Sequence, residues 1–144
     1  MLLLLVVSTP AESGLSVMAV ILVPASGDDL TINWWNWRPT VALLVRAGVL
    51  PPGERADRCE SNGCGGYLSA TEAIQAADHI ESLVARMATN ERLLSRGEIV
   101  AVPESDKPVS EWTEEEAYQR YAARRELLVP FADFCRRSGG FQVV

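Results

Sequence analysis

Tryptophan is concentrated in one short segment of this chain. Three of the four tryptophans lie within Asn33–Pro39, whose sequence is NWWNWRP. The residues Leu30–Trp34 are β-branched and aromatic enough for a strand, and the apolar residues that follow Pro39 recur at helical spacing. Because proline suits the first position of a helix and favours an extended residue before it, we expect a strand-to-helix junction at Arg38 and Pro39.

Short β-prone runs alternate with helix-spaced segments along the rest of the chain. Strands are expected at Met18–Val23, Leu30–Trp34, Glu98–Val102 and Phe141–Val144, and residues 51–68 are expected to form an irregular loop. This order of elements predicts an α+β fold with a small, mainly antiparallel sheet and three to four helices packed on one face.

The helices are expected where apolar spacing follows a start signal. Pro39 opens a short helix that Gly48 ends, and capping boxes (Ser69 with Glu72, Thr113 with Glu116) open helices that reach about Ala88 and Gly139. An interior proline destabilises a helix by about 3 kcal/mol. We therefore expect a break near Leu128–Val129, with a separate short helix from Pro130 to Arg137.

The length and charge of the chain limit its class. Its 144 residues suit one domain, and no apolar run is long enough to cross a membrane. Met18 opens the first strand-like run, so we expect a single domain at 18–144 and an optional or mis-assigned N-terminal extension at 1–17. The apolar run Leu2–Val7 is short for a secretion signal and no basic residue precedes it.

The formal charge of −6 disfavours nucleic acid and anionic lipid as partners. Together with the short apolar run at the N-terminus, this charge leads us to expect a cytoplasmic protein with no nucleic-acid or membrane partner.

The tryptophan segment is the leading candidate for a binding site. We expect Trp35 to be the most exposed indole, and Arg38 to lie beside the helix N-terminus, where free amides favour an anion. With Asn36 and Trp37 these residues form a candidate site for a protein or a small molecule, identity unknown. The alternative is that the tryptophans only pack the helix against the sheet.

A glycine-rich loop at 62–67 is expected to adjoin that site. Asn62 and Tyr67 are its polar side chains best placed to contact a ligand. Its glycines do not match a phosphate-binding motif. Positive backbone angles and close packing explain them better.

Two further classes of function remain open. Cys59, Cys64, His79 and Cys135 are the residue types of a zinc-binding module. However, His79 lies on the polar stripe of its helix and Cys135 on the apolar face of the last helix, so we expect reduced thiols, no metal and no cofactor.

With one histidine and no G-x-S-x-G motif, nucleophilic catalysis is disfavoured. A hydrolase or transferase with an unrecognised carboxylate site is the second alternative to a non-enzymatic binding protein.

Three segments carry a resemblance. They are NWWNWRPT at 33–40, NGCGG at 62–66 and FCRRSGGF at 134–141. Together they resemble a family of small uncharacterised bacterial proteins, and the likeness covers about residues 18–144. The resemblance implies Met18 as the natural start and implies no activity and no catalytic residue.

Overall fold

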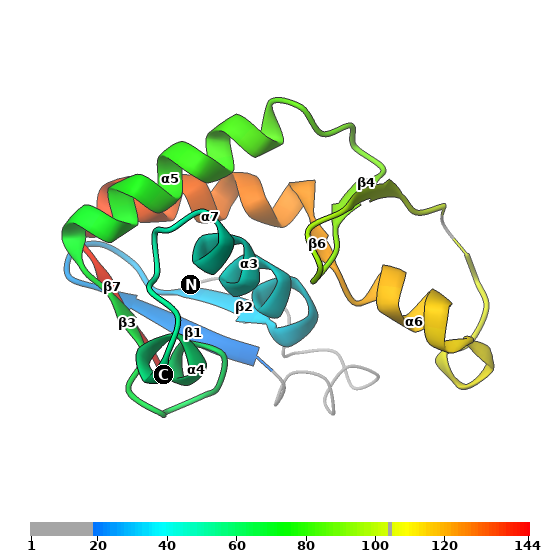
Figure 1. Cartoon of the computed structure of the whole chain (residues 1–144), viewed down its shortest axis with the longest axis horizontal. Coiled ribbons are helices and arrows are strands. Elements are labelled where there is room, and N and C mark those ends of the chain that lie inside the picture. The colour runs from blue at the N-terminus through cyan, green and yellow to red at the C-terminus, as the bar shows by residue number, and fades with distance from the viewer. Residues whose placement is uncertain (1–18, 104) are drawn as a thin grey trace.

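The computed structural model describes residues 19–103 and 105–144, and the expected α+β fold is confirmed (Figure 1). A four-stranded antiparallel sheet has the order β2-β1-β7-β3, and a three-stranded antiparallel sheet has the order β5-β4-β6. The strands are β1 (Ala19–Pro24), β2 (Leu30–Asn33), β3 (Tyr67–Leu68), β4 (Glu91–Leu93), β5 (Ile99–Ala101), β6 (Ala123–Arg124) and β7 (Phe141–Val143). The expected single sheet is therefore two sheets. The expected extension at 1–17 lies outside the described residues.

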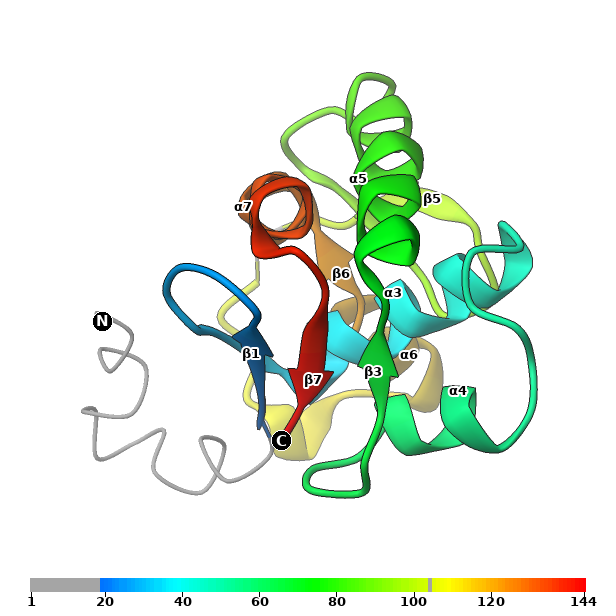
Figure 2. The same cartoon turned by 90° about the vertical axis from the view of Figure 1, so that its left-hand side faces the viewer.

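Five α-helices and one 3₁₀ turn complete the described part of the chain. They are α3 (Trp34–Arg46), α4 (Glu54–Cys59), α5 (Ala70–Val84), η2 (Val109–Glu111), α6 (Glu114–Arg120) and α7 (Arg125–Ser138). Helices α5 and α7 lie side by side in both views, and α6 lies at the end of the molecule opposite β3 and β7 (Figures 1 and 2).

The core lies on one face of the four-stranded sheet. Alternate residues of its strands are buried, and the register places them on the same face: Val20, Leu22, Ile32, Leu68, Phe141 and Val143. The intervening residues Ile21, Tyr67 and Gln142 are exposed, as the two-residue period of a strand requires. Helices α3, α5 and α7 each contact this sheet and fill its buried face.

Helix α3 begins at Trp34, so the expected junction at Arg38 and Pro39 is wrong. Asn33 caps the helix, since its side-chain oxygen accepts a hydrogen bond from the amide of Asn36 at 3.0 Å. Pro39 lies in the second turn, where one missing amide is outweighed by the cap and the buried face of the helix. The expected C-terminal end is confirmed, because the helix stops before Gly48, whose φ is +79°.

The region expected as an irregular loop contains regular structure. Helix α4 forms within it because Ala56 and Cys59 bury one side against the core. Strand β3 pairs Leu68 with Phe141 of β7. Strand β4, which the pattern did not predict, pairs with both β5 and β6.

The C-terminal helical region is interrupted earlier than expected. Helix α6 ends at Arg120, and β6 pairs with β4 before α7 begins. Pro130 lies inside α7 and no separate helix begins there, so the break expected near Leu128–Val129 is wrong. Pairing between β6 and β4 across a long sequence separation ends α6, and the proline is accommodated in the second turn of α7.

The capping box at the start of α5 is confirmed and carries a second interaction. Glu72 accepts a hydrogen bond from the amide of Ser69 at 2.9 Å and from both terminal nitrogens of Arg55 at 2.6 Å. The hydrogen bond from Arg55 holds the pKa of Glu72 below its ordinary value. The helix ends at Val84, short of the expected Ala88.

We predict that Glu72→Gln lowers the free energy of unfolding by about 1–2 kcal/mol at pH 7, because it removes a paired carboxylate and weakens the cap. A lowered folded-state pKa means that this stabilisation is fully present above the ordinary value of 4.5 and is lost as the pH falls through the folded-state pKa. Urea unfolding at pH 7 and in acid measures both effects. The control is Glu54→Gln, which removes an exposed ion pair to Arg58 and is expected to change stability by less than about 0.5 kcal/mol. Equal losses in the two variants would contradict the assignment.

Candidate functional site

A cavity of about 450 Å³ lies between α3 and α6. We call it the aromatic groove. It is lined by Trp34, Trp35, Arg38, Pro39, Ser95, Glu114, Ala117, Tyr118 and Tyr121. Small-molecule sites in proteins commonly have volumes of about 300–1,000 Å³ with apolar walls and a few polar groups. The groove has this size and this kind of lining.

The rings of the groove contact each other across its two walls. The ring centroids of Trp35 and Tyr121 are 5.2 Å apart with an interplanar angle of 36°, and Tyr121 also contacts Trp112 at 5.5 Å. Trp35 is half-buried and Tyr121 is 38% exposed. Part of each ring therefore faces solvent, which leaves apolar area that a ligand can cover.

Helix α6 is held against the protein by its polar and aromatic side chains. The Tyr118 hydroxyl accepts hydrogen bonds from the backbone amide and the Nε of Arg96 at 3.0 and 2.8 Å, and lies 3.0 Å from Glu98 Oε1, to which it donates. No residue of α6 is buried. The α6 wall of the groove thus rests on surface contacts, unlike the α3 wall, which is anchored in the core.

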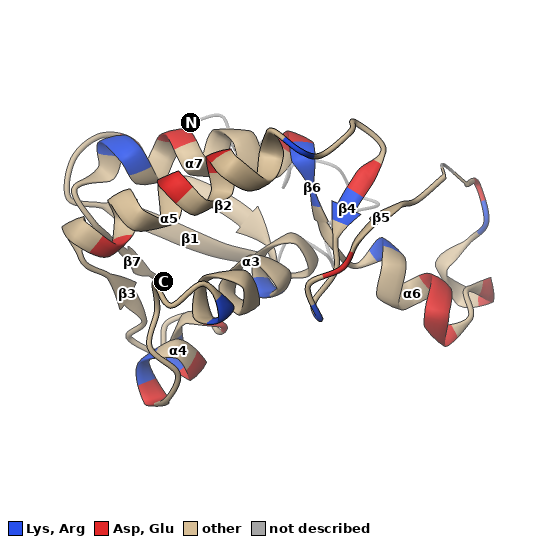
Figure 3. Cartoon of the chain, turned by 45° about the horizontal axis from the view of Figure 1, so that its top comes forward, with Lys and Arg blue, Asp and Glu red and all other residues tan. Residues whose placement is uncertain are grey.

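Two opposite charges that belong to no ion pair among the described residues line the groove. The guanidinium of Arg38 lies 5.0 Å from the ring centroid of Trp34, and Glu114 lies in the first turn of α6. Both side chains are exposed, and within residues 19–103 and 105–144 neither belongs to an ion pair. Figure 3 shows basic residues on α3 and acidic residues on α6. Arg38 lies in the second turn of α3, so the expectation that it sits beside a helix N-terminus is wrong.

Trp37 and Asn36 face the interior, which corrects the expectation that they contact a ligand. Trp37 is fully buried and donates its indole N–H to the carbonyl of Cys59 at 2.7 Å. Asn36 is 5% exposed, and its side-chain oxygen accepts from the amide of Arg124 at 2.9 Å. If the sequence had indicated that the helix begins at Trp34, Trp37 would share one helical stripe with Val41 and Leu44, and its burial would be expected.

The glycine loop does adjoin the tryptophan segment. The indole N–H of Trp34 donates to the side-chain oxygen of Asn62 at 3.0 Å, and the side-chain amide of Asn62 donates to the carbonyl of Ala19. Asn62 therefore positions Trp34 and does not line the groove. Tyr67 lies on the outer face of the four-stranded sheet, 4.5 Å from the guanidinium of Arg55, and is also outside the groove.

Of the residues proposed from the sequence, Trp35 and Arg38 line the groove. Sequence reasoning missed the opposite wall, which Glu114, Tyr118 and Tyr121 supply. Tyr121 has the helical spacing of a buried face, so its local pattern indicated core. The sequence does contain two tyrosines, Tyr118 and Tyr121, soon after the capping box of Thr113 and Glu116. No local pattern, however, predicts that this segment lies beside α3.

The zinc tetrad expected as an alternative is not assembled. In the described part of the chain, no three histidine, cysteine or acidic side chains are grouped so that they could hold a metal ion. Cys59 is buried and contacts the carbonyl of Tyr67, Cys135 is buried in α7, and His79 and Cys64 are exposed. Burial raises the pKa of the Cys59 and Cys135 thiols, which opposes the thiolate form that a metal requires.

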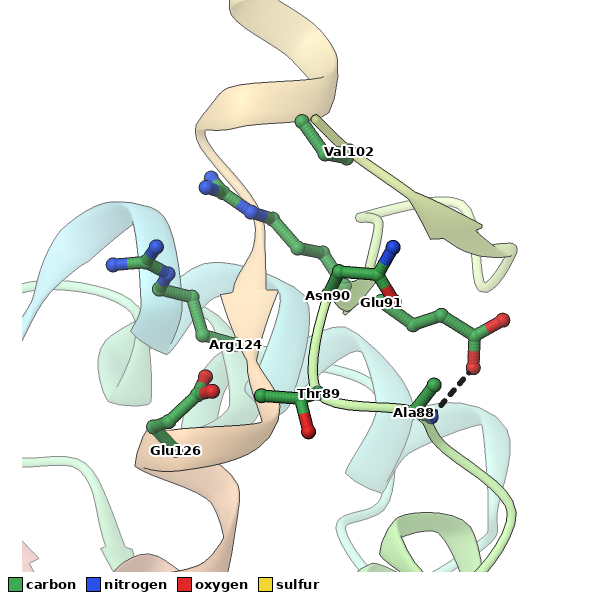
Figure 4. Close-up of a pocket in the computed structure, with 8 residues that line it drawn as sticks. Ala88, Thr89, Asn90, Glu91, Val102, Arg124 and Glu126 are labelled. Carbon is green, nitrogen blue, oxygen red and sulfur yellow. Dashed lines mark hydrogen bonds between the residues drawn. The ribbon is translucent and has the colours of Figure 1, made fainter. Parts of the chain in front are cut away.

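A second cavity, of about 410 Å³, lies where the segment leading into β4 meets β6 and α7. Figure 4 shows Arg124 and Glu126 on one side of it and Asn90 and Glu91 on the other. Glu91 accepts a hydrogen bond from the amide of Ala88 at 2.8 Å. Arg92, which also lines the cavity, is 9% exposed and donates to the carbonyl of Arg120, and neither arginine is without a partner. Glu91 and both arginines are already engaged, so this cavity is the weaker candidate.

None of the helices in the described ranges has the length and apolar character of a membrane span. Comparison of the chain with protein-family models, curated proteins and solved structures finds no match.

Proposed function

We propose that this protein is a non-enzymatic binding protein whose aromatic groove takes an aromatic group of a small ligand. The observation that carries the proposal is the pair of partly exposed, tilted rings of Trp35 and Tyr121 on opposite walls of one cavity. Burial of apolar area releases about 25 cal/mol per Å², and offset or tilted aromatic pairs add to that gain. A planar ring that enters the groove obtains both contributions.

The groove also has the geometry of an adaptable site. Its α3 wall is fixed by the cap at Asn33 and by the buried side chain of Trp37. Its α6 wall contains no buried residue and is held by surface contacts, so fewer buried contacts oppose its displacement by a ring than oppose displacement of α3. One fixed wall and one adjustable wall favour a ligand-binding role over simple packing.

We place this function in the cytoplasm with a small-molecule ligand, in preference to nucleic acid. Cys59, Cys64 and Cys135 are all free thiols, as is usual in a reducing compartment. The net charge of −6 opposes a polyanionic partner.

We predict that Trp35→Ala weakens binding of p-cresol, a neutral aromatic probe, by about tenfold while the protein stays folded. Titration followed by the indole N–H resonances of ¹⁵N-labelled protein measures the affinity. In the wild type, the Trp34 and Trp35 resonances are expected to move and that of buried Trp37 to stay in place.

Tyr67→Ala is the matched control, since it removes an exposed aromatic side chain outside the groove. It is expected to bind p-cresol as the wild type does. Unchanged affinity in Trp35→Ala, with circular dichroism showing a folded protein, would remove the groove as the binding site.

A further inference from the structure

We infer that the aromatic groove takes a zwitterionic aromatic ligand, of the chemical class of the aromatic α-amino acids. The carboxylate pairs with Arg38, the ammonium pairs with Glu114, and the ring lies against the solvent-facing parts of Trp35 and Tyr121, whose centroids are 5.2 Å apart. This inference rests on the proposed function and specifies the ligand of the same site.

The charges of the groove carry the inference. Two neighbouring pairs of charged side chains are already engaged: Lys107 pairs with Glu116 at 3.0 Å, and Arg96 approaches Glu98 at 3.9 Å. Arg38 and Glu114 line one cavity, and of the residues that the structure describes neither pairs with the other nor with a third. A ligand with one charge of each sign satisfies both.

Ligands with a single charge fit less well. An aromatic carboxylate gains the Arg38 contact but places its negative charge near Glu114, and an aromatic amine has the reverse mismatch. A nucleotide adds several negative charges to a protein that already carries −6. An arginine favours carboxylates because its planar guanidinium can donate two parallel hydrogen bonds.

The size of the groove agrees with this class. A cavity of about 450 Å³ accommodates one ring with a short polar chain and leaves room for a few waters at the rim. Ser95, which also lines the cavity, adds a hydroxyl that can bond to either polar group of such a chain.

The experiment compares four probes that share a phenyl ring. They are L-phenylalanine, 3-phenylpropionate with only the carboxylate, 2-phenylethylamine with only the ammonium, and N-acetyl-L-phenylalanine amide with neither. We expect L-phenylalanine to bind about tenfold tighter than each singly charged probe and about a hundredfold tighter than the neutral one, measured by the same indole N–H titration.

Two variants test which side chain of the groove binds each charged group of the ligand. In Arg38→Gln, L-phenylalanine is expected to bind no better than 2-phenylethylamine, and in Glu114→Gln no better than 3-phenylpropionate. Arg86→Gln and Glu115→Gln, which change exposed charges that do not line the groove, are expected to keep the wild-type order of affinities.

The outcomes separate the two proposals. Equal affinity for all four probes would overturn the zwitterion inference and leave an aromatic-binding groove. Tightest binding of N-acetyl-L-phenylalanine amide would also overturn it and would indicate that the groove binds an aromatic ring within a peptide. Failure to bind any of the four probes or p-cresol would overturn the proposed function as well. Loss of preference in the two control variants would assign the selectivity to the overall charge and overturn the roles of Arg38 and Glu114.

Discussion

Replacement of Trp37 by alanine is expected to lower the free energy of unfolding by about 3–5 kcal/mol, the range found when large aromatic side chains are removed from cores. Trp37 is fully buried, and its ring meets those of Phe131 and Phe141 edge-on at centroid distances of 5.6 and 6.5 Å. These contacts join α3 to α7 and to β7. Because small domains are stable by only about 5–15 kcal/mol, the loss removes a large part of the total.

The indole N–H of Trp37 contributes in addition to its ring. The carbonyl of Cys59 lies at the C-terminal end of α4, where carbonyls lack partners within the helix, and it accepts the indole N–H at 2.7 Å. Trp37→Phe keeps most of the ring contacts but leaves this carbonyl without its donor. We expect it to destabilise by about 1–3 kcal/mol, between the wild type and Trp37→Ala.

Trp35→Ala is the matched control for the same chemical change two positions away. Trp35 is half-buried and makes its ring contact with Tyr121 of the α6 wall, so its removal is expected to destabilise by only about 1 kcal/mol. Urea unfolding followed by circular dichroism compares the variants. Equal unfolding midpoints for Trp35→Ala and Trp37→Ala would contradict the assignment of Trp37 to the core and Trp35 to the groove.

Features set by local interactions could be predicted from the sequence. The capping boxes of Ser69 with Glu72 and Thr113 with Glu116 both form, because each is completed within one helical turn. The strand at the C-terminus forms at Phe141–Val143, where apolar residues alternate after the left-handed residue Gly139. In each case residues a few positions apart decide the structure.

Features set by distant contacts could not be predicted in this way. Strands β3, β4 and β6 have only two or three residues each, and pairing with partners far along the chain decides whether such short segments become strands. The start of α3 shows the same limit. The preference of Pro39 for a first turn is a weak local signal, and the Asn33 cap together with burial of Trp37 overrides it.

The residues of the aromatic groove show the same difference between local and long-range interactions. Trp35 and Arg38 could be identified from the density of aromatic residues in one segment. Tyr118 and Tyr121 could not, because only the folded chain brings α6 beside α3. The residues of the α3 wall could therefore be predicted from the sequence, whereas the α6 wall depends on long-range packing.

Gly66→Ala is expected to lower the free energy of unfolding by about 3 kcal/mol, since added atoms in a tightly packed interior cost about 1–3 kcal/mol or more. A Cβ at Gly66 would lie 2.5 Å from the Cα and 2.6 Å from the N of Cys59, and these backbone atoms cannot rotate away. The backbone of Gly66 is also fixed from the other side, because its carbonyl accepts the amide of Val143 at 2.9 Å. The methyl group must therefore push α4 and β7 apart.

Gly63→Ala separates this steric effect from the conformational role of glycine in the same loop. Gly63 has a φ of +65°, with nothing within 4 Å of an added Cβ, so its replacement is expected to cost only the left-handed strain of about 1 kcal/mol. Displacement of α4 in Gly66→Ala also moves Asn62, which accepts the indole N–H of Trp34, so the Trp34 resonance is expected to shift in Gly66→Ala. If Gly66→Ala were as stable as Gly63→Ala, close contact with the backbone of Cys59 would not be what requires glycine at position 66. A greater loss in Gly66→Ala would establish the close contact between the loop and α4, and a shifted Trp34 resonance would establish that this contact supports the α3 wall of the aromatic groove.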